Sequence, residues 1–403
     1  NLASLWLTRS PPHDFQPATG IVLYSGMKRI AVICFIAIVW APVCLQSQTA
    51  RLVDTQATRN TSALFHQLRQ LRMKGTLFGH QDALAYGFGW KYEKGRSDIK
   101  DVTGDYPAVY GWELGHLELD RPINLDSVPF DRMKQFIREG YERGGVITIS
   151  WHLSNPLTGK SAWDPAPGTV DAILPGGEKH GVYTSWLDKV AAFLADLKGS
   201  KGEYIPVVFR PFHELNGNWF WWGKDHCSPE AFKALWRFTI SYLRDEKKLR
   251  HLLYAFNTDR FYSREEYLER YPGDEWVDVI GFDIYQRDGN HQQFMKAFDQ
   301  MLTMLENLAT EKNKIPAVTE FGYGNLPDST WWTSVFGKVL SKHKMSWVLA
   351  WRNAGRKYNG TVEFYVPYKG HPAAPDFKKF YDEAYTLFQQ DVTKEKLYEE
   401  GNW

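Results

Sequence analysis

The sequence predicts a (β/α)8 TIM barrel that forms a single catalytic domain. From about residue 61 onward, short apolar runs alternate with segments of helical periodicity. No Ser/Gly-rich linker or low-complexity stretch divides the chain, and 403 residues can bury one large core. This alternation favours a parallel barrel, with a doubly wound open sheet as the alternative.

Eight apolar runs are expected to be the barrel strands, at residues 76–79, 108–112, 146–151, 205–209, 252–256, 277–282, 315–319 and 347–351. Between them, apolar residues recur at helical spacing in the segments 130–140, 186–197, 229–243 and 294–305. The third of these helices has a clear start, because Ser228 can cap it and Pro229 suits its first position.

Residues 27–48 resemble a signal peptide. Met27 and two basic residues precede an apolar stretch that Pro42 interrupts and that is short for a bilayer span, so a cleaved leader is favoured over an anchor. Lipidation at Cys44 is the alternative. Residues 1–26 precede the plausible initiator and are excluded from the fold, which leaves 49–403 as the catalytic domain. We expect export to the periplasm or surface of a bacterium.

The composition points to a neutral substrate. The 48 basic residues nearly balance the 47 acidic ones, so a nucleic acid or anionic membrane partner has no electrostatic footprint. The chain contains 17 Trp, 21 Tyr and 24 Phe, which suits carbohydrate binding or a densely packed core. Outside the leader Cys227 is the only thiol, so no internal disulfide is expected.

One segment places a single carboxylic acid between basic and aromatic side chains. Residues 209–222 include Arg210, His213 and Glu214, followed by four successive aromatic residues from Trp219. The apolar run 205–208 precedes them, so Glu214 should lie just past a strand end, where barrels place ligand-facing residues. Four neighbouring aromatic residues are not expected to point inward together, and aromatic faces stack on sugar rings. The alternative is a buried Glu214 paired with Arg210 beside an aromatic core.

A second carboxylic acid is needed for glycoside hydrolysis, because one group donates a proton and the other acts as nucleophile or base. Glu320 supplies it, at the end of the seventh apolar run and before a turn that contains Gly322. The chemistry requires one of the two acids to be ionised and the other to be protonated. The Pro- and Gly-rich segment 153–181, which contains Trp163, is a candidate wall of the cleft or else a disordered loop.

These motifs together resemble a known family. Glutamates at the ends of strands four and seven are similar to those of the retaining glycosidase clan A. The segment from Arg210 to Gly223 resembles glycoside hydrolase family 26, the β-mannanases, over about residues 60–390. The resemblance implies a retaining endo-β-1,4-mannanase that hydrolyses mannan or galactomannan by double displacement, with Glu214 as acid/base and Glu320 as nucleophile. Clan members commonly have Asn before the acid, whereas family 26 resembles this chain in having a histidine, His213.

The resemblance also implies substrate-binding roles for five residues. His152 is similar to the family's histidine at the sugar on the non-reducing side of the cut, and Trp351 to the tryptophan beneath that sugar. Trp219 resembles the aromatic residue that contacts the leaving sugar, and Tyr285 the tyrosine that hydrogen-bonds the nucleophile. His213 would hydrogen-bond sugar hydroxyls or the acid.

Several of these residues also have a structural explanation. A histidine at a strand end, such as His152, is often a satisfied structural group; Trp351 alone suits a core, and Tyr285 could satisfy Asp283. Arg210 is expected to be a fixed cation that keeps one carboxylate charged.

No cofactor or metal is expected. The segment 213–217 begins like a zinc-protease helix, but Gly217 stands where the second histidine ligand must be. His226 and Cys227 have no further ligands at zinc-finger spacing.

Three alternatives to an endo-acting mannanase stay open. The resemblance extends to family 26 activities on mixed-linkage β-glucan or β-1,3-xylan. A non-catalytic mannan-binding protein on the same scaffold has no need for two glutamates at opposite strand ends. The segments 113–120 and 153–181 could close one end of the cleft, which would favour release of mannobiose.

Overall fold

The computed structural model describes residues 51–356, 360–399 and 401, and these form a closed barrel of eight parallel strands. Each strand pairs with its neighbours in chain order, and the last returns to the first through pairs such as Leu77 with Trp347. The strands are β1 (Thr76–Gln81), β4 (Val109–Glu113), β5 (Val146–Trp151), β6 (Val207–Pro211), β7 (Leu252–Thr258), β8 (Val279–Gln286), β9 (Ile315–Tyr323) and β10 (Trp347–Ala350). The predicted barrel and its eight strands are confirmed.

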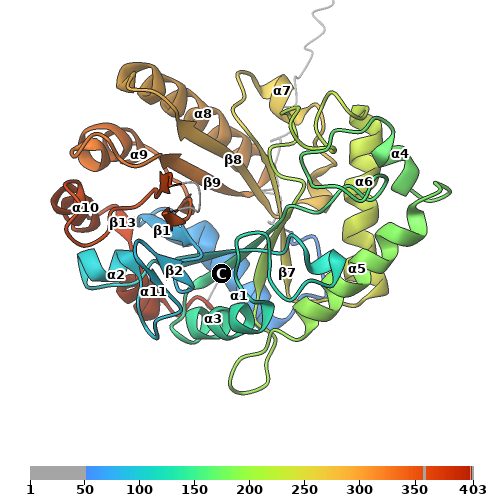
Figure 1. Cartoon of the computed structure of the whole chain (residues 1–403), viewed down its shortest axis with the longest axis horizontal. Coiled ribbons are helices and arrows are strands. Elements are labelled where there is room, and N and C mark those ends of the chain that lie inside the picture. The colour runs from blue at the N-terminus through green and yellow to red at the C-terminus, as the bar shows by residue number, and fades with distance from the viewer. Residues whose placement is uncertain (1–50, 357–359, 400, 402–403) are drawn as a thin grey trace, which may run out of the picture. The chain divides into compact units, whose positions relative to one another are not determined.

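Helices surround the barrel (Figure 1). The four predicted helices are present as α3 (Phe130–Glu142), α5 (His180–Ala195), α6 (Pro229–Ser241) and α8 (His291–Lys312). At the start of α6 the Ser228 hydroxyl accepts a hydrogen bond from the amide of Ala231 at 3.1 Å, as its sequence predicts. The remaining helices are α1 (Arg59–Leu71), α2 (Asp98–Thr103), α4 (Thr169–Ile173), α7 (Arg264–Leu268), α9 (Lys338–Leu340), α10 (Ala374–Tyr381) and α11 (Gln389–Glu395).

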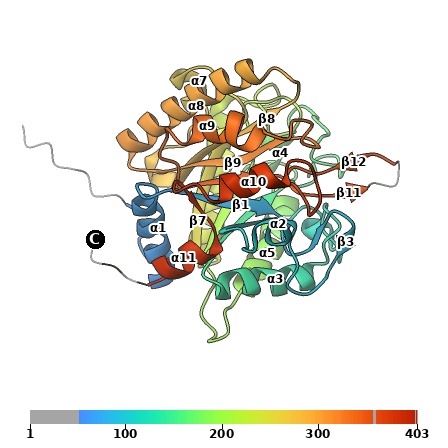
Figure 2. The ribbon, with the colours of Figure 1, turned by 90° about the vertical axis from the view of Figure 1, so that its left-hand side faces the viewer.

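Short strands and helical turns lie at the two ends of the barrel. A small hairpin joins β11 (Gly355–Arg356) and β12 (Val362–Glu363), and a second joins β2 (Tyr86–Gly87) and β3 (Trp90–Lys91). Figure 2 shows α1 on one side of the molecule and the β11–β12 hairpin on the opposite side. The others are β13 (Thr386–Leu387), which pairs with β1, the 3-10 turns η1 (Leu117–Leu119) and η3 (Asp274–Trp276), and the π-helical η2 (Tyr242–Glu246) and η4 (Trp332–Gly337).

The core has two layers. Inward-facing aliphatic residues of the strands pack with Leu64, Phe65 and Leu68 of α1, so α1 covers the amino end of the barrel. Outward-facing strand residues pack with the surrounding helices in a second, aromatic-rich layer. Complete burial of an aliphatic or aromatic side chain contributes about 1.5–3 kcal/mol. The interior of the barrel is thereby closed at its amino end by apolar side chains.

The predicted upstream segment 1–26, the leader 27–48 and the candidate lipidation site Cys44 lie outside the described residues. Across the part of the chain that the structure does describe, no helix combines the length and apolarity needed to cross a membrane. Cys227 is a free, half-buried thiol.

Candidate active site

Both predicted catalytic acids lie at the carboxyl ends of barrel strands. Glu214 follows β6, and Glu320 lies within β9. One oxygen atom from each of Glu214, Glu320 and Asp283 lies within 4.8 Å of the other two. The fold therefore brings the two predicted acids and a third carboxylate into one cluster.

A β-bulge turns Glu320 toward the barrel interior. Phe282 of β8 pairs with Val318, but Asp283 pairs with Glu320, so Thr319 is an extra residue in β9. The Thr319 hydroxyl donates to Asp283 at 2.7 Å, which places two successive residues of β9 on the inner face. The strand was expected to end at 319; it continues to 323 because the bulge restores its pairing with β8.

The Glu320 carboxylate is 4 % exposed and receives a donor on each oxygen. The Arg210 guanidinium donates to one oxygen, and the Tyr285 hydroxyl donates to the other at 2.8 Å. Arg210 also donates to Asp283 at 3.1 Å and to Asn257 at 3.2 Å. Burial disfavours the charge on Arg210, but Glu320 and Asp283 outweigh it and raise the pKa of Arg210. This fixed cation and the Tyr285 hydroxyl hold the Glu320 carboxylate in one orientation.

Glu214 lies in different surroundings. Burial raises the pKa of the Glu214 carboxyl well above its usual value, and the negative charges of Asp283 and Glu320 raise it further. The Trp219 indole donates to Glu214 at 2.7 Å and fixes the direction of the carboxyl group. Two neighbouring glutamates thus differ in environment in the way that acid/base and nucleophile roles require.

The backbone around Glu214 is strained. Phe212 and Glu214 have φ angles of 53° and 52°, in the left-handed region, where a non-glycine residue costs about 1–3 kcal/mol. Surrounding contacts maintain this conformation: the Trp222 indole donates to the carbonyl of His213 at 2.9 Å, and the Gly217 amide donates to that of Glu214 at 2.9 Å. The acid is therefore positioned by a backbone that its neighbours hold in place.

The four successive aromatic residues do not form the predicted sugar-stacking wall. Phe220, Trp221 and Trp222 are 3, 0 and 0 % exposed, and only Trp219 is half-exposed beside the acid. The expectation was wrong because the segment folds into tight turns that direct all three side chains into the core. The Trp221 indole, for example, donates to the carbonyl of Leu153 at 3.1 Å.

His152 and His213 form a pair that the sequence did not reveal. Their Nε2 atoms lie 2.9 Å apart, and His152 Nδ1 lies 2.8 Å from the Glu113 carboxylate. His213 is 1 % exposed, and no hydrogen bond joins its ring to Glu214 among the described residues. It was expected to contact the sugar or the acid, but it lies behind His152 instead.

The segment 153–181 is ordered and reaches the site. Its Trp163, 47 % exposed, stacks on His152 with ring centroids 5.3 Å apart and an interplanar angle of 19°. Trp351, which follows β10, lies 6.5 Å from the same histidine by ring centroids. Exposed and half-buried aromatic rings thus come from two loops that face His152, as the prediction of a cleft wall requires.

Sequence reasoning underrated three polar residues of the site. Glu113 was noted only as part of a loop, and Asn257 was not considered, although both are fully buried and bonded to site residues. Asp283 was considered only as a partner for Tyr285, whereas it bonds Arg210 and Thr319. The one signal in the sequence that could have revealed these three residues is that each is a polar residue at or near the carboxyl end of an apolar run.

Glu214, Asp283 and Glu320 are close enough together to hold a cation, and they are the only such group of three found in the described ranges. Arg210 already donates to Asp283 and Glu320, so a metal ion would have to displace a buried guanidinium. The set therefore fits a guanidinium better than a metal. His226 contacts the Asn218 carbonyl at 2.8 Å.

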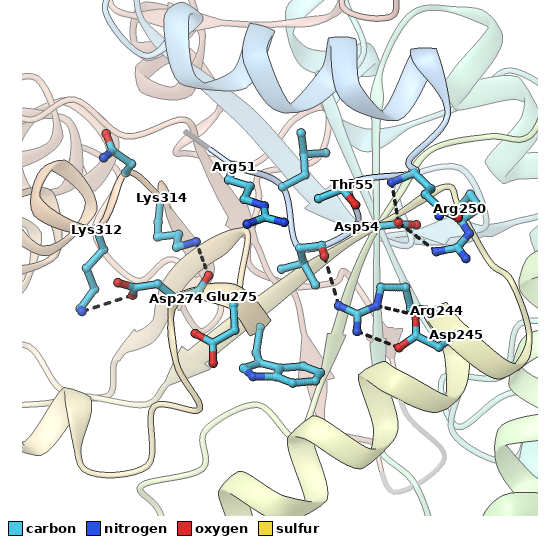
Figure 3. A pocket seen from close by; sticks show the side chains of 15 residues that line it. Arg51, Asp54, Thr55, Arg244, Asp245, Arg250, Asp274, Glu275, Lys312 and Lys314 are labelled. Carbon is cyan, nitrogen blue, oxygen red and sulfur yellow. Dashed lines mark hydrogen bonds and ion pairs between the residues drawn. The ribbon is translucent and has the colours of Figure 1, made fainter. Parts of the chain in front are cut away.

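A hollow lined by charged side chains lies at the other end of the barrel (Figure 3). Its volume is about 570 Å³, and Arg250, Asp274 and Lys314, which line it, precede β7, β8 and β9. Its charged side chains pair with each other, as Arg250 does with Asp54 at 2.9 Å. Barrel enzymes carry their chemistry at the carboxyl ends of the strands, so this hollow is not the candidate active site.

A parallel barrel that brings two glutamates with different surroundings together at the carboxyl ends of its fourth and seventh strands defines a glycoside hydrolase. The family model for glycosyl hydrolase family 26 matches residues 53–363. The chain belongs to this family.

Relatives and solved structures agree with this placement. A "Mannan endo-1,4-beta-mannosidase" of Bifidobacterium adolescentis is 32 % identical over 83 % of this chain, which spans only 35 % of that longer protein. One of Bacillus subtilis is 30 % identical over 63 % of this chain and 68 % of its own length. The structure of a family 26 β-mannanase from Bacteroides ovatus is similar with a TM-score of 0.81 and 45 % identity, covering 85 % of this chain and 98 % of that one.

Proposed function

We propose that this protein is a retaining endo-β-1,4-mannanase that hydrolyses mannan or galactomannan. The observation that carries the proposal is the carboxylate pair: oxygens of Glu214 and Glu320 lie within 4.8 Å. Retaining glycosidases hold their carboxyl groups roughly 5–5.5 Å apart, whereas inverting enzymes leave roughly 6.5–9.5 Å for a water molecule. The different surroundings of the two acids support the same mechanism.

In the first step the Glu320 carboxylate attacks the anomeric carbon while Glu214 donates its proton to the departing glycosidic oxygen. The bond from carbon to the leaving oxygen breaks as the covalent glycosyl bond to Glu320 forms. Because the charge of Glu320 raises the pKa of Glu214, loss of that charge lowers it. Glu214 can then accept a proton from water, whose oxygen releases the sugar with its configuration retained.

The substrate assignment rests on the relatives, which are named as mannan endo-1,4-beta-mannosidases. We assign His152 and Trp351 to the sugar on the non-reducing side of the cut and Trp219 to the leaving sugar. The half-exposed Trp219 lies directly beside the acid, and Trp351 faces His152, which supports these positions. His213 is assigned to the support of His152 rather than to the sugar.

Hydrolysis of several polysaccharides by the purified protein tests this function. Reducing sugar should be released from β-1,4-mannan and galactomannan faster than from mixed-linkage β-glucan or β-1,3-xylan, and nuclear magnetic resonance should detect the β-anomer first. Faster turnover of either alternative polymer would reassign the substrate. Binding of mannan without release of sugar would identify a non-catalytic protein.

Products at early times distinguish random cleavage from release of mannobiose. Long mannan should yield a range of oligosaccharides if the cleft is open at both ends. Mannobiose as the sole early product would instead indicate that loops such as 113–120 close one end.

We also propose that the protein is exported, on the basis of the leader-like segment 27–48. N-terminal sequencing of the mature protein from cell fractions tests this, and an uncleaved chain in the cytoplasm would contradict it.

A further inference from the structure

We propose that Glu113 is a positioning residue for the acid Glu214 and acts through His152 and His213. The proposal rests on the glycosidase function proposed above. Glu113 lies at the end of β4, whereas the acid follows β6, and the two histidines bridge the distance. No family assignment or relative's name bears on this residue.

The first link is the environment of the Glu113 carboxylate. It is completely buried and accepts four hydrogen bonds. The amides of Gly115 and His152 donate to one oxygen, both at 2.6 Å, and the Ser150 hydroxyl at 2.6 Å and His152 Nδ1 at 2.8 Å donate to the other. Burial opposes ionisation, but His152 and these donors outweigh it and lower the pKa of Glu113 to about 2. The group is a fixed anion.

The second link is the proton arrangement of His152. An ionised carboxylate only accepts hydrogen bonds, so Nδ1 of His152 must carry a proton. The Nε2 atoms of His152 and His213 lie 2.9 Å apart, and one further proton lies between them. Glu113 places that proton on His152: burial alone would lower the pKa of His152, but Glu113 outweighs it and raises the value. Burial, His152 and Arg210 lower the pKa of His213, so His213 is the neutral acceptor, and its Nδ1 then carries a proton that has no hydrogen-bond partner among the described residues.

Other charged groups around the histidine pair agree with this arrangement. Asp126, whose carboxylate pairs with Arg352 at 3.1 Å, and Glu320 both favour the charged form of His152. On the far side, Arg210 disfavours a charge on His213. The positive charge therefore belongs on the ring nearest to Glu113.

The third link joins His213 to the acid. His213 stands between Phe212 and Glu214, both of which have left-handed backbone. Its ring is held by His152 and its carbonyl by the Trp222 indole. Strained backbone persists only where surrounding contacts determine it. Loss of the Glu113 charge would let the shared proton move to His213 and the ring of His152 turn, which would loosen the hold on His213 and let the backbone at Glu214 relax away from the leaving oxygen.

The test is the substitution Glu113→Gln assayed with two substrates. Mannan has a poor leaving group and needs the proton from Glu214, whereas 2,4-dinitrophenyl β-mannobioside has a leaving group that needs none. A displacement of the acid by about 1 Å costs roughly 100-fold. We expect kcat on mannan to fall by roughly 100-fold and the rate at which dinitrophenol is released in the first turnover to fall by less than about 5-fold, at unchanged melting temperature.

The matched control is Glu118→Gln. Glu118 is also a buried glutamate, and it accepts from the Trp151 indole and the Ser154 amide on either side of His152 without touching a histidine. Glu118→Gln should change the rates on both substrates by the same factor. If Glu113→Gln does not fold, Ser150→Ala, which removes one donor to Glu113, should show the same substrate dependence with a smaller loss. Equal losses on both substrates, or no loss, would overturn the proposal.

A measurement that does not require activity separates this inference from the proposed function. Nitrogen chemical shifts of the two histidine rings should show a charged His152 and a neutral His213 at pH 7, and a neutral His152 in Glu113→Gln. Two neutral rings in the unsubstituted protein would overturn the inference even if mannan is hydrolysed. An inactive protein with the expected shifts would contradict the proposed function alone.

Discussion

The two ends of the barrel both gather charged side chains, but they hold them differently. At the carboxyl end, the paired side chains of Arg210 and Glu320 are 3 and 5 % exposed. In the hollow at the amino end, those of Lys312 and Asp274 are 16 and 53 % exposed. Buried charges interact strongly and shift the pKa values of their neighbours, whereas exposed ion pairs contribute about 0–1 kcal/mol. The burial of its charged side chains therefore distinguishes the end that holds the candidate active site.

The two ends of the barrel should differ most in the loss of rate caused by substituting the two candidate catalytic acids. Glu320→Gln or Glu214→Gln should lower kcat/KM on mannan by roughly 10⁴-fold, because each variant removes a group that makes or breaks a bond. Glu275→Gln, in the amino-end hollow, should leave the rate within about 2-fold. Substantial residual turnover by Glu320→Gln would contradict its assignment as nucleophile.

A smaller loss is expected at Tyr285, which donates to Glu320 at 2.8 Å. A hydrogen bond to a charged group is worth about 1.5–3 kcal/mol, so Tyr285→Phe should lower kcat by roughly 10- to 150-fold. The matched control is Tyr254→Phe in β7, because the Tyr254 hydroxyl is buried and has no hydrogen-bond partner among the residues that the structure describes. Activity that falls equally in both variants would show that the hydroxyl contact is not the cause.

At the amino end, titration should change stability and not activity. His251, just before β7, is 1 % exposed, and burial lowers its pKa to about 4. In the folded state it stays neutral between pH 6.5 and 4, while in the unfolded state it gains a proton, so its contribution to stability is lost as the pH falls through this window. The loss at pH 5 relative to pH 7.5 is about 2 kcal/mol.

Urea unfolding of the protein and of His251→Gln at both pH values measures this contribution. The variant should lose less stability on acidification than the unsubstituted protein. An identical pH dependence would show that other groups dominate.

The smallest effect is expected in the hollow itself. Lys312→Ala removes an ion pair of 3.2 Å with Asp274, whose side chain is half-exposed. It should lower the free energy of unfolding by at most about 1 kcal/mol and leave kcat unchanged. A stability loss of several kcal/mol would remove the contrast between the two ends.

Much of the fold was predictable because it depends on local periodicity. The eight strands and four principal helices follow from apolar spacing, and the start of α6 follows from Ser228 and Pro229. The two acids were recognisable because each follows an apolar run. These features depend on residues that are neighbours in the chain.

The features that were missed depend on register between strands. The pairing of His152 with His213 joins β5 to the end of β6, and the burial of Phe220 and Trp221 depends on a loop that starts at Leu153. An aromatic residue has the same local signal whether it lines a cleft or fills a core. Contacts between distant segments decide between these outcomes, and no local pattern records them.

The bulge at Thr319 has a consequence for transplanting this site to another barrel. Side chains of a regular strand alternate between two faces, and the extra residue resets that alternation halfway along β9. Copying the residues of β9 in order, Thr319 included, onto a strand without the bulge would turn Glu320 toward the helix layer. Deleting Thr319 here would instead leave Glu320 facing inward on a regular strand, but it would remove the hydroxyl that donates to Asp283 at 2.7 Å. The bulge thus supports the candidate active site in two ways, through the spacing that it sets and through the Thr319 side chain that it brings to the inner face.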